Sequence, residues 1–271
     1  MLHWKIMTPR PLVTLVLAFS SVCVPVRASL IIGGFDSTRG GFESVANSSV
    51  ESDLRDAITG RFPGVTFSST GTLTAPYLSG VNVLLLGVAQ GDFAAISPLT
   101  AAEQTALLSF VDAGGTAVLF ADNSDFDLNN QAPAANASFL SPFGLAADGT
   151  LTGNQSATFL SGGGSLDTYY PTDFSTLGGS TELAAFTSNG QPAAAYFPRG
   201  ALMANSGAVV FFADSSMMLN GFLTPNDATA ILNAIALEQT GTPGGVTTPE
   251  PASWLIAAAG LALTAGLKKL A

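Results

Sequence analysis

The feature that most constrains the fold of this chain is a strand, helix and strand unit between residues 81 and 121. Val81–Val88 (VNVLLLGV) is continuously apolar, which is typical of a parallel strand covered on both faces. Thr100 and Glu103 form a capping box for an apolar-faced helix that stops at a glycine pair. Ala117–Ala121 then resumes as a buried strand. This order predicts a right-handed crossover between two parallel strands.

Four further segments extend the same pattern. Leu30–Phe35 and Gly207–Ala213 are short apolar runs that predict strands, and each is closed by an aspartate. Ser48 with Glu51 predicts the capping box of one helix, and Thr224 opens another. The sequence therefore predicts an α/β fold with a doubly wound, mostly parallel sheet within residues 29–240.

The pattern loosens between residues 122 and 200. Glycine, serine and asparagine separate short alternating pieces such as ELAAFTS and PAAAYF. We expect an irregular, β-rich insertion here, with partly antiparallel strands.

Two predicted strands end alike, in TAVLFADNS (116–124) and in FFADSS (211–216). The carboxyl ends of parallel strands meet at one edge of a sheet, where doubly wound folds bind ligands. We therefore expect Asp122 and Asp214 to lie on the same rim.

The residue types of the body exclude several kinds of catalysis. Between Ser29 and Thr247 there is no Cys, His or Lys, so a Ser-His-Asp triad, a Ser-Lys dyad and a zinc site have no components. Four arginines face eighteen acidic residues there, a net charge of −14 that disfavours nucleic-acid binding. We expect a protein that is not an enzyme and has no cofactor.

Two kinds of chemistry stay open. A carboxylate pair drawn from Asp92, Asp122 and Asp214 would suit a glycoside hydrolase. A calcium site would use Asp122, Asp125, Asp127 and Asp214, because calcium prefers six to eight oxygen ligands. The same loop also reads as ordinary Asx turns after a strand.

Tyr169-Tyr170 is the one adjacent pair of tyrosines in the body. A sugar platform is one interpretation of such a pair, and core packing or a loop anchor is the favoured one, because both tryptophans lie outside the body.

The first 28 residues predict a secretory signal. A basic flank precedes the apolar stretch PLVTLVLAFSSVCV, and cleavage is expected between Ala28 and Ser29. The alternative, a membrane anchor, needs about 20 apolar residues, and this stretch is shorter.

After a predicted linker at 241–248 comes the triplet Pro249-Glu250-Pro251, then fourteen apolar residues from Trp254 to Leu267, then Lys268-Lys269. This segment, 249–271, resembles the PEP-CTERM sorting signal of Gram-negative bacteria. The resemblance implies sorting by an exosortase, in cells that often make exopolysaccharide, after export across the inner membrane and cleavage by signal peptidase. It also implies a short transmembrane helix that holds the protein at the membrane before processing. An ordinary tail anchor with a chance triplet is the alternative.

The body also resembles a family. Val81–Phe126, with its core LTAAEQTALLSFVDAGGTAVLFAD, and the later GAVVFFADSSMMLNGF are similar to class I glutamine amidotransferase-like domains, chiefly the non-catalytic ones of gliding-motility accessory proteins. This implies a flavodoxin-like sheet. Because the catalytic Cys and His of true amidotransferases are missing, we expect an envelope or extracellular-matrix protein with a binding or structural role. A carboxylate- or calcium-dependent hydrolase of extracellular polysaccharide is the alternative.

Overall fold

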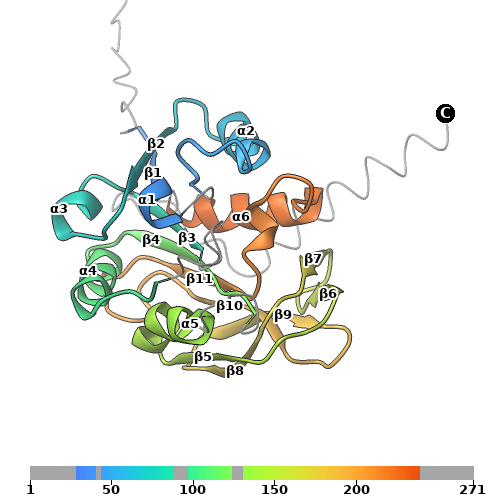
Figure 1. Ribbon diagram of the computed structural model, residues 1–271. Helices are drawn as coiled ribbons and strands as arrows, with labels where there is room; N and C mark the ends of the chain where they lie inside the picture. The colour runs from blue at the N-terminus through green and yellow to red at the C-terminus, as the bar shows by residue number, and fades with distance from the viewer. Residues whose placement is uncertain (1–28, 41–43, 88–96, 124–130, 239–271) are drawn as a thin grey trace, which may run out of the picture.

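The computed structural model describes residues 29–40, 44–87, 97–123 and 131–238. Within them, nine strands form one sheet in the order β2-β1-β3-β4-β11-β10-β9-β6-β7 (Figure 1). Their bounds are β1 Ile31–Phe35, β2 Thr66–Thr70, β3 Val83–Gly87, β4 Thr116–Phe120, β6 Asn154–Phe159, β7 Ser165–Tyr169, β9 Thr181–Phe186, β10 Pro192–Phe197 and β11 Val209–Phe212. A separate antiparallel pair consists of β5 Leu145–Asp148 and β8 Asp173–Leu177.

The helices cover both faces of the sheet. Figure 1 shows α2 and α6 together on one side and α4 and α5 on the other. The longer helices are α2 Ser52–Arg61, α4 Ala101–Asp112, α5 Ala132–Leu140 and α6 Pro225–Ala236. The short ones are α1 Ser37–Gly40, α3 Ala75–Leu78, η1 Ser141–Phe143 and η2 Ser216–Met218.

The first half of the sheet is parallel. β2, β1, β3, β4 and β11 all run in the same direction, and β3 continues through α4 into the adjacent β4. Each central strand is buried along nearly its whole length, as β4 shows with five buried residues in succession. The predicted doubly wound α/β fold is confirmed.

The second half of the sheet is antiparallel. β10, β9, β6 and β7 continue from β11, so the sheet as a whole is mixed. The region 122–200 does contain short antiparallel strands, as expected, but four of them extend the main sheet. It also contains α5, which the sequence analysis did not predict.

One of the two predicted capping boxes is present, and the helix start predicted at Thr224 has one as well. The Thr100 hydroxyl accepts from the Glu103 amide while the Glu103 carboxylate accepts from the Thr100 amide, and Thr224 with Asp227 repeats this exchange at α6. The box expected from Ser48 and Glu51 is wrong. The Ser48 hydroxyl accepts instead from the Val50 amide in a local turn, and α2 begins only at Ser52.

The expected transmembrane helix, and with it the membrane as a partner, requires a correction. Among the residues that the structure describes, no helix is long and apolar enough to cross a membrane. Residues 249–271, where we expected that helix, lie outside the described residues.

Candidate functional site

Asp122 and Asp214 lie side by side at the carboxyl ends of two adjacent parallel strands. β4 and β11 pair so that Phe120 stands opposite Phe212, and each aspartate follows two residues later. Both are buried, with 4% and 0% of their surface exposed. The expectation that these two carboxylates share one rim is confirmed.

The Asp122 carboxylate is surrounded by donors. One oxygen accepts from the Asn123 backbone amide at 2.7 Å and from its side-chain amide at 3.2 Å. The other accepts from the Ser215 hydroxyl at 2.6 Å. Burial raises the pKa of Asp122 well above its ordinary value, and the negative charge of Asp214 raises it further, although these hydrogen bonds act in the opposite direction.

The Asp214 carboxylate ties its own strand end to β7. It accepts from the Ser216 amide at 2.8 Å and from the Ser216 hydroxyl at 2.6 Å. It also accepts from the Tyr169 backbone amide, 45 residues away in sequence, at 2.6 Å. Burial raises the pKa of Asp214 to about 6 in spite of these bonds, and the charge of Asp227 adds to the rise.

The polar groups around the two acids hold the turn between β7 and β8. The Asn123 side-chain amide donates to the Tyr170 carbonyl at 2.7 Å, and the Thr172 amide donates to the Ala213 carbonyl at 3.0 Å. Behind them, the Asn136 side chain bonds both the amide and the carbonyl of Asp122. Both carboxylates are buried, so in this conformation a substrate could not contact them directly. Their role here is to hold the backbone of the turn between β7 and β8.

An exposed aromatic cluster forms where Phe222 packs against the tyrosine pair of this anchored turn. Tyr169, Tyr170 and Phe222 expose 40%, 37% and 42% of their surface. The Tyr169 ring is 4.8 Å from that of Tyr170, nearly perpendicular to it, and 5.0 Å from that of Phe222. Among the described residues these are three of the five large apolar side chains that are exposed, the others being Leu160 and Met203. Interpreting the tyrosine pair as core packing or a packed loop anchor therefore does not account for the exposed surface of the two rings.

Tyr170 also has unusual backbone geometry. Its φ of 55° is the one positive value that a non-glycine residue adopts in the described part of the chain. A bulky residue in the left-handed region costs about 1–2 kcal/mol, and such strain is concentrated at functional sites. The bond from Asn123 to the Tyr170 carbonyl helps to maintain this conformation.

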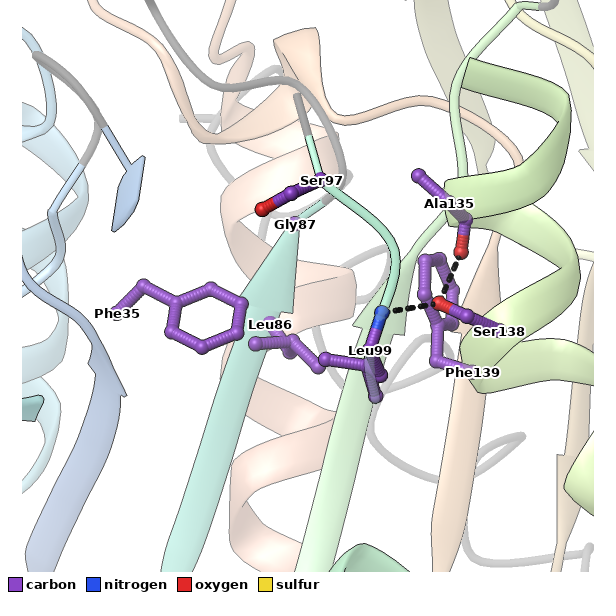
Figure 2. Close-up of a pocket in the computed structure, with 8 residues that line it drawn as sticks. All are labelled: Phe35, Leu86, Gly87, Ser97, Leu99, Ala135, Ser138 and Phe139. Atoms are coloured by element: carbon purple, nitrogen blue, oxygen red, sulfur yellow. Dashed lines mark hydrogen bonds between the residues drawn. The ribbon is translucent and has the colours of Figure 1, made fainter. Parts of the chain in front are cut away.

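The crevice where sheets of this type commonly bind ligands is nearly filled. That crevice lies outside the carboxyl ends of β1 and β3, where the strand order reverses. Figure 2 shows Phe35, Leu99 and Phe139 converging there, around a space of about 10 Å³. The Ser138 hydroxyl accepts from the Leu99 amide at 2.8 Å and donates to the Ala135 carbonyl at 2.7 Å. This space would hold about one water molecule, which needs roughly 10–15 Å³.

Several predicted site residues fall outside the described residues. These are Asp92, Asp125, Asp127, Ala28 and the triplet Pro249-Glu250-Pro251. Ser29, the residue after the expected cleavage point, is exposed. In the part of the chain that the structure describes, no three acidic, histidine or cysteine side chains come together as a metal site would require. Asp122 and Asp214 alone do not complete the calcium site, which stays a prediction.

Phe222 and Asn136 are not among the site residues that the sequence predicts. Phe222 joins the tyrosines from 52 residues away, and Asn136 comes from the unpredicted α5. Neither residue is part of a local motif, so no signal in the sequence marks them.

No family model matches this sequence, and no curated protein matches it significantly. The chain is similar to solved structures. These likenesses show the fold alone. The mmIFT52 N-terminal domain aligns at 11% identity over 81% of this chain and 100% of that domain, with a TM-score of 0.59. Cytoplasmic protein STM1381 of Salmonella typhimurium LT2 aligns at 12% identity over 79% of this chain and 100% of its own, with a TM-score of 0.51. A ThuA-like protein of Bacteroides uniformis ATCC 8492 aligns at 13% identity over 80% of this chain and 93% of its own, with a TM-score of 0.44.

Proposed function

We propose that this chain is a non-enzymatic binding protein whose contact surface is the aromatic cluster Tyr169, Tyr170 and Phe222. The observation that carries the proposal is the exposure of these three rings, two of them on a strained turn that a buried acid pair holds in place. Exposed tyrosines are the typical anchors of binding surfaces, because they bury large areas at a small cost in side-chain entropy. Backbone strain that surrounding hydrogen bonds maintain is concentrated at functional sites.

The proposal includes export, as the N-terminal sequence predicts. The binding partner is then a component of the cell envelope or the extracellular matrix. The Pro249-Glu250-Pro251 triplet acts as a sorting signal of the PEP-CTERM type. Changing the triplet to three alanines in the native host tests this part separately, because the size and the location of the protein must then change.

The binding role is tested by retention on cell envelopes isolated from the native host. A variant with Tyr169→Ser, Tyr170→Ser and Phe222→Ser is compared with wild type and with a control, Met203→Ser. The control removes a large apolar side chain that is exposed outside the cluster. We expect loss of retention in the first variant only. Equal retention of all three proteins would refute the proposal.

The hydrolase alternative is distinguished by turnover. It requires Asp122 or Asp214 to meet a substrate, and both are buried. Purified protein is assayed against glycosides and polysaccharides with and without calcium. Turnover that Asp122→Asn or Asp214→Asn abolishes in a folded variant would replace the binding proposal with the hydrolase.

A further inference from the structure

A second apolar feature lies on the face of the sheet that α6 covers, apart from the aromatic cluster. It is a cavity of about 170 Å³ between α6 and the strands β6, β9, β10 and β11. Most of its lining is apolar. Its lining includes Leu160, Val210, Phe212, Ala230, Ala234 and Leu237.

The cavity exists because α6 presents small side chains to the sheet here. Ala230 and Ala234 face Val210 and Phe212, and two alanines leave space that larger residues would fill. At the edge of the cavity, Leu160 is 60% exposed. An apolar occupant would remove this surface from water, which is worth about 25 cal/mol for each Å² buried.

The chain itself leads from this cavity into an apolar segment. Leu237 lines the cavity, and the described residues end at Glu238. Fifteen residues later the sequence reaches Trp254, which opens the fourteen-residue apolar run to Leu267. Fifteen extended residues span up to about 50 Å, so the run has ample reach to return to the cavity from which the chain departs.

We propose that residues 254–267 dock on this face of the domain, with the Trp254 side chain in the cavity. A cavity of about 150 Å³ lined by Leu, Ile and Phe takes up benzene, so the space here suits one aromatic side chain. Charge supports the same occupant, because the lysines Lys268-Lys269 follow the run and the body carries a net charge of −14. Covalent linkage gives the segment a local concentration in the millimolar range.

Trp254 provides a direct test, because the chain has only two tryptophans and Trp4→Phe leaves Trp254 as the single reporter. We expect blue-shifted emission and protection from iodide quenching in the full chain, at a protein concentration where sedimentation shows a monomer. Ala234→Leu fills the cavity and is expected to shift the emission to the red. Thr229→Leu, at an exposed position of the same helix, is the matched control and is expected to leave it unchanged. An emission maximum typical of a solvent-exposed tryptophan in every variant would overturn the proposal.

A dye experiment identifies the occupant. N-phenyl-1-naphthylamine should bind the Trp254→Ala chain about tenfold more tightly than the wild-type chain, because the tethered competitor is weakened. Ala234→Leu combined with Trp254→Ala should abolish that gain. Equal dye affinity in the wild-type and Trp254→Ala chains shows that the segment does not occupy the cavity. Blue-shifted emission that appears only as the protein dimerises assigns the cavity to a second copy. Either result overturns the proposal, and neither bears on retention through the aromatic cluster.

Discussion

The Tyr169 backbone amide donates a 2.6 Å hydrogen bond to the carboxylate of Asp214, which is fully buried. One ring of the exposed aromatic cluster is thereby tied to the end of a central parallel strand. Doubly wound folds commonly place ligand-binding groups at this rim. Here Asp214 instead holds the backbone of the exposed aromatic cluster in place. This relationship joins the buried pair and the exposed rings in one site.

Removing that support should destabilise the protein. Asp214→Ala leaves the amides of Tyr169 and Ser216 without their acceptor, so we expect a loss of about 2–4 kcal/mol in the free energy of unfolding, measured with urea. Asp167→Ala is a control on β7, the strand that Asp214 holds, because the Asp167 carboxylate accepts an exposed hydrogen bond from Ser156. A loss of the same size in the control would contradict the assigned role of Asp214.

The acid pair should make stability depend on pH. Burial raises the folded-state pKa of both aspartates, and that of Asp214 to about 6, while an aspartate in the unfolded chain titrates near 3.9. The folded state therefore holds more protons between these values. The contribution of Asp214 to stability is complete below about pH 4 and is lost as the pH rises through about 6, and the raised pKa of Asp122 acts in the same direction.

Asp122→Asn tests this dependence, because an amide keeps the size of the side chain and does not ionise. We expect the melting temperature of wild type to fall relative to that of the variant between pH 4.5 and pH 7.5. A constant difference between the two proteins over this range would show that Asp122 does not titrate there.

Glu51 should limit stability at neutral pH. It is 2% exposed, one of its carboxylate oxygens has no hydrogen-bond partner, and burial raises its pKa to about 7 although the charge of Arg55 lowers it. Its folded-state pKa exceeds the unfolded value, so stability is lost as the pH rises through 7. Glu51→Gln should therefore raise the free energy of unfolding at pH 8 by about 1–3 kcal/mol and change little at pH 5. Asp53→Asn, exposed on the same helix, should show no such difference between the two pH values.

Tyr170→Gly should separate stability from binding. Glycine adopts a φ of 55° without strain, so we expect the loss of the ring to be offset and the free energy of unfolding to change by less than about 1 kcal/mol. Retention on cell envelopes should fall, because one ring of the cluster is gone. Tyr169→Gly, where φ is not positive, should lower both quantities. Unchanged retention in Tyr170→Gly would remove Tyr170 from the binding surface.

The sequence by itself determined the parallel half of this protein and the meeting of Asp122 with Asp214. The strands Val83–Gly87, Thr116–Phe120 and Val209–Phe212 are continuous apolar runs, and the capping boxes at Thr100 and Thr224 join residues three apart. The sequence predicts these features because each capping box joins residues three apart in the chain. Parallel strands also bring their carboxyl ends to one edge of the sheet whatever their other contacts.

Only the tertiary structure decided the rest. It continued the parallel sheet with four antiparallel strands, placed α5 behind Asp122, and buried Glu51 where a helix cap was expected. It also brought Phe222 onto Tyr169 and turned the tyrosine pair toward solvent. These outcomes depend on contacts between residues that are far apart in the chain. Exposure and burial are properties of the packed whole, and the short alternating segments between residues 122 and 200 have no local pattern that specifies their neighbours.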